Sequence, residues 1–302
     1  MLVVTGPPRS GTSLVCNLLQ GLGCDFGPEE KLIPGNRWNE LGYFENTDIV
    51  AMNHQLILGS WVDSEPWTVS VWPDSRIERL RRLVVLALGR ATMTKRNIQR
   101  RSRKKYERLE ALQAQYADCT VKDPRFCFTL PAWGDSVKGV LFCIRHPREI
   151  ADSMAAQSGF SRAIGYYAYH RWTRWFFRHD HPYPVSWVDY NRLISQEGFE
   201  GEMRRLYAFM GRPFDPDEAR AVQARTVRTD LHHNRADLRD LPFPVRWAYE
   251  DLLRRHRESE PIADVEPLRS DRSSGRRADT IQGPDAGSAI PRPVSGGSGR
   301  AG

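Results

Sequence analysis

The stretch TGPPRSGTS, residues 5–13, constrains the fold of this chain more than any other part of it. Gly6 and Gly11 bracket four residues, which is the spacing of a phosphate-binding loop. The apolar run MLVV before it predicts a short strand, and apolar residues at helical spacing after it predict a helix over 12–23. This order lets loop amides and a helix N-terminus face one anion. We therefore predict an anion-binding loop at the end of the first strand.

The charges in this loop differ from those of a nucleoside-triphosphate enzyme. Such enzymes carry a lysine that neutralises the β- and γ-phosphates, next to a hydroxyl that holds Mg²⁺. Here Thr12 occupies the lysine position, Ser13 retains the hydroxyl, and Arg9 lies inside the loop. The pattern favours a nucleotide with a single 5′-phosphate and a transferable group attached. A structural glycine turn and a kinase-like loop with a substituted lysine are the alternatives.

A second motif, RHPREIADS, begins where the most apolar segment of the chain ends. Residues 137–144 predict a buried strand with Arg145 at its C-terminal end, and Pro147 suits the first turn of a following helix. Ser153 lies eight residues after Arg145, on that helix. An arginine and a hydroxyl that converge in this way suit a second phosphate group. An ordinary strand-end ion pair and a helix serine would explain the motif if it stood alone.

Short strands alternate with helices along the chain. Two further strands are predicted near residues 119–124 and 183–190. This alternation predicts an α/β fold: a three-layer sandwich with a central, mostly parallel sheet and a P-loop-like loop. Ligands of such sheets bind outside the carboxyl ends of the strands. Since the 5–13 loop and Arg145 both follow a strand, we expect them to share one site.

The domain organisation follows from shifts in composition. We predict one α/β domain over residues 1–262, with a basic helical insertion over 75–117 and a tail over 263–302. The tail is rich in Gly, Ser, Pro and Arg, and it has too few large apolar residues to offset the entropy of ordering. We therefore expect it to be disordered.

The basic insertion concentrates much of the formal net charge of +7. Residues 76–108 contain thirteen Lys and Arg and only two acidic residues, Glu78 and Glu107. A solvated helix face is the first interpretation. Contact with an anionic partner, such as an acidic glycan or a membrane surface, is the second. Nucleic acid is not expected, because no binding module is recognised and aromatic residues are sparse in this run.

Composition also bears on the compartment and on metals. The chain has no apolar run of about eighteen residues that would span a bilayer. Its start lacks the features of a signal peptide, so we expect a cytoplasmic protein. Five cysteines without a CxxC pair, and no Cys/His cluster with ligand spacing, predict free thiols and no metal site.

The motifs PPRSGTSL and RHPREIADS together resemble those of the sulfotransferases that use 3′-phosphoadenosine 5′-phosphosulfate (PAPS). In that family the first motif holds the 5′-phosphosulfate, and the second holds the 3′-phosphate through an Arg and a Ser at this eight-residue interval. NELGYFE and KDPRFCFTLPAW are similar to segments of bacterial members, and VSWVDYNRLI to a later strand and helix. The resemblance covers roughly residues 1–215. It implies sulfuryl transfer from PAPS, without a metal, to a hydroxyl of a carbohydrate, glycolipid or other small acceptor.

The resemblance also implies a set of PAPS-binding residues: Pro8, Arg9, Ser10, Gly11, Thr12, Ser13, Arg145, Ser153 and Trp187. Many soluble members have lysine where this chain has Arg9, whereas the Golgi-type tyrosylprotein enzymes have arginine. Arg9 would place charge-assisted hydrogen bonds on the bridging oxygen as negative charge develops there. Trp187 matches an aromatic residue near the adenine in relatives, and core packing is an equal alternative for it.

Transfer to a hydroxyl requires a base, and three carboxylates are candidates. Glu45 and Glu30 rank close together, the latter resembling a carboxylate of the tyrosylprotein enzymes; Asp123 ranks third. Each has the alternative of a solvated charge, and Asp123 has the further alternative of pairing with Arg125. Lys122 would assist the transferred group or close a salt bridge.

Two other functions compete with this prediction. A P-loop kinase-like phosphotransferase would bind ATP and Mg²⁺. A catalytically inactive nucleotide-binding scaffold would keep the binding residues and lack a working base. The missing loop lysine argues against the first, and the joint presence of Arg9, Ser10, Arg145 and Ser153 argues against the second.

Overall fold

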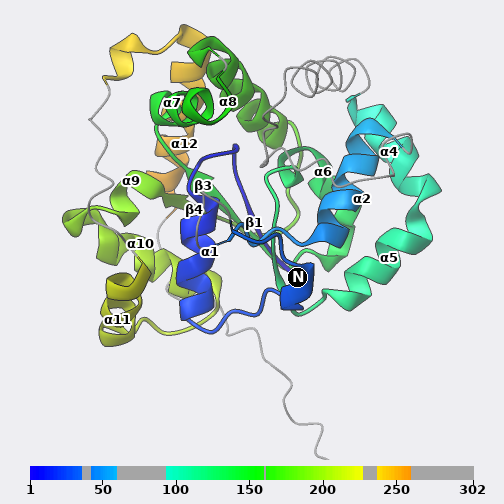
Figure 1. Ribbon diagram of the computed structural model, residues 1–302, viewed down its shortest axis with the longest axis horizontal. Coiled ribbons are helices and arrows are strands. Elements are labelled where there is room, and N and C mark those ends of the chain that lie inside the picture. Colours follow the sequence, from blue (N-terminus) through cyan, green and yellow to red (C-terminus); the bar gives the residue numbers. More distant parts are fainter. Residues whose placement is uncertain (36–41, 60–92, 160, 227–236, 260–302) are drawn as a thin grey trace, which may run out of the picture. The chain divides into compact units, whose positions relative to one another are not determined.

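A four-stranded sheet forms the centre of the part of the chain that the structure describes (Figure 1). All of its strand pairs are parallel, and the order is β2-β1-β3-β4. The strands are β1 (Leu2–Thr5), β2 (Thr120–Lys122), β3 (Gly139–Ile144) and β4 (Val185–Asp189). The computed structural model describes residues 1–35, 42–59, 93–159, 161–226 and 237–259. All of these lie in one unit, Met1–Leu268.

Helices connect the strands. Those between β1 and β2 are α1 (Thr12–Gly21), α2 (Thr47–Leu58), α4 (Lys95–Lys104) and α5 (Tyr106–Gln115). Between β2 and β3 lies α6 (Phe126–Trp133), and between β3 and β4 lie α7 (Pro147–Ser158) and α8 (Arg162–Phe177). After β4 come α9 (Tyr190–Leu193), α10 (Gln196–Phe209), α11 (Pro216–Thr226) and α12 (Phe243–Glu258). Short 3₁₀ turns are η1 (Glu29–Lys31), η3 (Gly134–Ser136) and η5 (Leu238–Asp240).

Alternate residues of the strands enter two separate apolar clusters. Val3 and Phe142 pack in a cluster with residues of α2, α6, α8 and α12. Val4 and Cys143 pack in the other, with residues of α1, α10 and α11. Because successive strand side chains point to opposite faces, the sheet is covered by helices on both of them. The α/β fold with a parallel sheet is therefore confirmed, and the helices form the two outer layers.

The strand order changes direction between β1 and β3. β1 and β3 are neighbours, and the chain leaves β1 toward β2 on one side and leaves β3 toward β4 on the other. In α/β proteins, ligands commonly bind at such a switch point, outside the carboxyl ends of the strands. The loop that begins at Gly6 follows β1, and Arg145 follows β3. As predicted, both motifs lie at the same sheet edge.

Within the predicted insertion over 75–117, residues 95–115 form α4 and α5, which lie beside α2 (Figure 1). The rest of the insertion, up to residue 92, and the predicted tail over 263–302 lie outside the described residues. Within the described residues, every helix is too short or too polar to cross a bilayer.

Helices α7 and α8 approach each other closely at Gly165. A Cβ added to Gly165 would lie 2.6 Å from the Cα and 2.8 Å from the Cβ of Ala151. We expect Gly165→Ala to lower the free energy of unfolding by about 1–3 kcal/mol, because the two backbones must separate. Gly201→Ala in α10 is the matched control, since its Cβ would meet only Arg192 Nη2, at 3.7 Å.

The control should raise the free energy of unfolding by up to about 1 kcal/mol, the usual gain of alanine over glycine inside a helix. Urea denaturation of both variants measures these changes. Equal effects of the two substitutions would show that α7 and α8 do not approach as closely as described.

Candidate active site

The loop after β1 contains three residues with positive φ. These are Gly6 at 147°, Arg9 at 69° and Gly11 at 91°. A Cβ on Gly6 would lie 2.7 Å from the carbonyl oxygen of Cys143, and one on Gly11 would lie 2.2 Å from the ring of Tyr190. Only glycine fits at these two positions. Arg9 adopts the left-handed conformation despite its side chain, which costs on the order of 1 kcal/mol and is typical of residues at binding sites.

Hydrogen-bond donors gather at this loop. Gly11 is the N-cap of α1, and no side chain caps the amides of its first turn, which begins at Thr12. The hydroxyl of Ser10 is buried and has no hydrogen-bond partner among the described residues. The helix N-terminus adds partial positive charge. An anion bound at the loop would satisfy these donors.

The two sequence motifs touch each other. Arg9 Nε donates a hydrogen bond to Ser153 Oγ at 2.9 Å. Arg145 Nη1 donates to the carbonyl oxygen of Arg9 at 3.1 Å. Gly11 lies two residues further along the chain, which adds at most about 7 Å. A single small ligand can therefore reach the loop, Arg145 and Ser153 together.

Arg145 is held by groups that the sequence analysis did not single out. Its Nε donates to Glu149 Oε2 at 2.9 Å, and Glu149 Oε1 accepts from Asn191 Nδ2 at 2.7 Å. The guanidinium stacks on the ring of Tyr190, 4.2 Å from its centroid. Two signals could have indicated these residues: the i,i+4 spacing of Arg145 and Glu149, and the DYN sequence that begins at the last residue of β4.

Positive charge exceeds negative charge at this point of the sheet edge. Burial lowers the pKa of Arg9; the Tyr43 phenol opposes this shift, and the Arg145 guanidinium adds to it. Among the described residues, Arg145 bonds both to the Glu149 carboxylate and to the backbone of Arg9, so two guanidiniums lie near each other here. A ligand with several negative charges would relieve the repulsion between the cations.

Glu45 and Lys122 form a buried ion pair. Lys122 Nζ lies 2.8 Å from Glu45 Oε1, and the two side chains are 3% and 4% exposed, lysine first. Lys122 Nζ also donates to the carbonyl oxygen of Tyr43 at 2.9 Å. Lys122 is the last residue of β2, so this pair lies at the same edge of the sheet as the loop. Of the two roles predicted for Lys122, the salt bridge is the one seen here.

Asp123 is fully buried in a closed polar network. Its Oδ1 accepts from the backbone amide of Arg125 at 2.9 Å and from Arg125 Nη1 at 2.8 Å, and its Oδ2 accepts from Asn53 Nδ2 at 2.8 Å. Burial raises the pKa of Asp123, and the Arg125 guanidinium opposes that rise. The pairing with Arg125, predicted as the alternative to a catalytic role, is present.

Two further predicted site residues lie apart from this cluster. Glu30 is exposed on η1 and makes no hydrogen bond or ion pair with any residue that the structure describes. Trp187 is 7% exposed in the apolar core, where its ring packs against Phe142 at 5.3 Å and Phe176 at 6.0 Å between centroids. Of the two roles predicted for Trp187, adenine contact and core packing, the structure shows core packing.

No family model matches the chain, and no curated protein or solved structure compared with it matches either. Within the described ranges, no group of three or more His, Cys, Asp and Glu side chains is placed to hold a metal ion. The feature of the sheet edge that bears on function is the contact of Arg9 with Ser153 and Arg145.

The Lys122–Glu45 pair allows a direct test of its structural role. We expect Glu45→Gln to lower the free energy of unfolding by about 3–5 kcal/mol, because it leaves a buried ammonium unpaired. The double variant Glu45→Gln/Lys122→Met should lose much less than the sum of the single variants. Urea denaturation of all four proteins gives the coupling energy.

Lys138→Met serves as the control for this cycle. Its partner Asp118 lies 2.9 Å away in an exposed pair, which solvent screens, so this change should leave the unfolding midpoint nearly unaltered. An unchanged stability of Glu45→Gln would mean that the carboxylate is not held by Lys122.

Proposed function

We propose that this protein is a PAPS-dependent sulfotransferase. The observation that carries the proposal is the contact between the two motifs, in which Arg9 bonds to Ser153 and Arg145 bonds to the Arg9 carbonyl. A donor with phosphate groups at both its 5′ and 3′ positions needs two adjacent anion sites on one edge of the sheet. The loop supplies amides and hydroxyls for one, and Arg145 with Ser153 supplies the other.

The proposed reaction is an in-line displacement at sulfur. The 5′-phosphosulfate end occupies the loop, with Ser10, Thr12 and Ser13 as hydroxyl donors. The acceptor oxygen forms a bond to sulfur while the bond from sulfur to the bridging oxygen breaks, and adenosine 3′,5′-bisphosphate leaves. Arg9 lies between the two anion sites, where it stabilises the charge that develops on the bridging oxygen. The acceptor's proton passes to a carboxylate base.

Glu45 is the base that we propose. The oxygens of Asp123 already accept three hydrogen bonds, and Glu30 is exposed on η1 without a link to the loop. Glu45 pairs with Lys122, which also binds the backbone of Tyr43, at the same edge of the sheet as the loop. In this proposal Lys122 positions the Glu45 carboxylate for the acceptor hydroxyl.

Ligand binding tests the nucleotide site. At one hundred times its dissociation constant, adenosine 3′,5′-bisphosphate should stabilise the protein by about 2.7 kcal/mol, which raises Tm by about 5–10 °C. Arg145→Ala and Ser153→Ala should remove most of this shift. Arg148→Ala is the matched control, because Arg148 lies on the same helix but pairs with Asp240 on the surface. Larger stabilisation by ATP–Mg²⁺ would favour a kinase-like phosphotransferase instead.

Transfer of radiolabelled sulfate from PAPS to cell-envelope fractions and small polyols tests the reaction. Arg9→Ala should lower kcat by about a hundredfold, the usual effect of removing one donor from a developing anion. Glu45→Gln should lower kcat while leaving the thermal shift with the bisphosphate intact. Binding of the bisphosphate by the unaltered protein without any sulfate transfer would favour an inactive scaffold.

A further inference from the structure

Helix α4 is unusual for the density of its positive charge. Six of its ten residues are Lys or Arg, and none is acidic. Ile98 is the one buried residue of this helix. Arg100 and Lys104 are four residues apart, so their like charges lie side by side on one face and oppose helix formation. A helix that serves only as a solvated face would gain stability from acidic residues at these spacings.

Two other surface helices of the described chain, α10 and α12, do carry such acidic partners. Arg204 pairs with Glu200 at 2.7 Å on α10, and Arg255 pairs with Asp251 at 3.0 Å on α12. By contrast, Arg100, Lys104 and Lys105 form no ion pair with any described residue. The excess charge of α4 is therefore local and uncompensated within the part of the chain that the structure describes.

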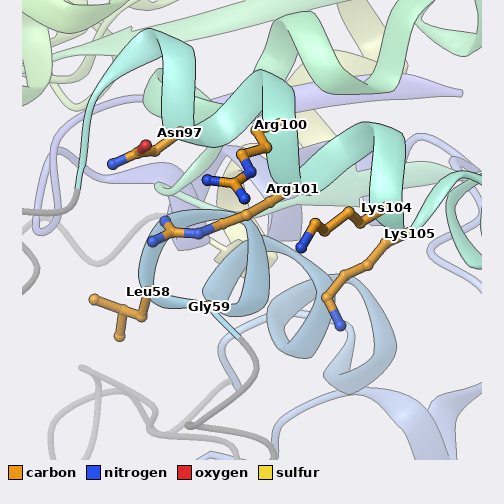
Figure 2. A pocket seen from close by; sticks show the side chains of 7 residues that line it. All are labelled: Leu58, Gly59, Asn97, Arg100, Arg101, Lys104 and Lys105. Atoms are coloured by element: carbon orange, nitrogen blue, oxygen red, sulfur yellow. The ribbon is translucent and has the colours of Figure 1, made fainter.

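These cations line a pocket of about 530 Å³ between α4 and the C-terminal end of α2. Figure 2 shows Arg100, Arg101 and Lys104 on α4 and Lys105 directly after it, above the end of α2 at Leu58 and Gly59. Asn97 adds a polar side chain, and Leu58 adds an apolar wall. No carboxylate is among the described residues that line the pocket. Its size falls within the range of about 300–1,000 Å³ that is typical of small-molecule sites.

Arg101 fixes the position of this pocket. Its Nη1 donates to the carbonyl oxygens of Leu56, at 3.1 Å, and of Ile57. These carbonyls are among the last of α2, where the helix dipole places partial negative charge. The guanidinium of Arg101 therefore makes its hydrogen bonds within the protein, and burial lowers the pKa of Arg101. The other three cations that line the pocket are Arg100, Lys104 and Lys105, and the bonds of Arg101 hold α4 against the end of α2.

We propose that this pocket binds a small, multiply charged oxyanion ester, that is, a sugar or polyol that carries two or more phosphate or sulfate groups. Three cations that have no ion-pair partner among the described residues match several negative charges. Both ester types accept charge-assisted hydrogen bonds from Arg and Lys. The concave shape and the Leu58 wall suit the carbon skeleton of such an ester better than a flat anionic surface. This site involves none of the residues proposed to bind the nucleotide, so it does not depend on the proposed function.

Binding of inositol hexakisphosphate to the full chain, measured by titration calorimetry at about 150 mM salt, tests the proposal. Two double variants remove the same charge from the same helix. Arg100→Gln/Lys104→Gln alters the pocket, whereas Arg96→Gln/Arg103→Gln alters residues of α4 that do not line it. The first should weaken binding by about tenfold or more, and the second should leave it within about twofold of the unaltered protein.

Three outcomes would overturn the proposal. If both double variants weaken the binding of inositol hexakisphosphate equally, the ligand is attracted by the total charge of α4 and does not occupy the pocket. Binding that is lost in Arg145→Ala and kept in Arg100→Gln/Lys104→Gln would place the ligand at the nucleotide site. Binding to phosphatidylserine vesicles without binding to inositol hexakisphosphate would identify a membrane-surface contact instead.

Discussion

The parallel pairing of β1 with β3 is the constraint on which the rest of the site depends. Leu2 pairs with Gly139 and Thr5 with Phe142, so the two strands start level and β3 runs two residues beyond the end of β1. The loop after β1 and the arginine after β3 must then emerge at the same edge, since parallel strands point in one direction. The bond from Arg145 to the Arg9 carbonyl is a direct consequence of this register. A slip of the pairing would move Arg145 away from the loop.

The two basic regions of this protein use positive charge in different ways. At the sheet edge, Glu149 orients the guanidinium of Arg145, which also stacks on Tyr190. This preorganised guanidinium lies next to the strained loop after β1. At α4, several cations line a pocket, and Arg101 bonds to the end of the neighbouring helix α2. The first arrangement suits a ligand of one exact shape, because its donors lose little freedom on binding. The second suits a class of ligands that share charge and size.

The buried polar groups near the sheet edge show why a base is hard to identify from sequence. Glu45, Asp123 and Glu30 are all carboxylates in polar-looking segments, and nothing in their neighbours along the chain separates them. Their environments in the fold differ greatly. One is paired with a buried lysine, one is saturated by three donors, and one is exposed. These differences come from partners such as Asn53, which lies seventy residues from Asp123 in the sequence.

The sequence by itself determined the four strands, the loop with its glycines, and the sharing of one sheet edge by Arg9 and Arg145. These follow from short-range patterns: apolar runs, helical spacing and the rule that parallel strands end at a common edge. The tertiary structure alone decided that Trp187 belongs to the core, that Lys122 closes onto Glu45, and that Tyr190 supports Arg145. Each of these contacts joins residues that lie far apart in the chain, and burial and partner choice at such distances depend on packing, which no local pattern encodes.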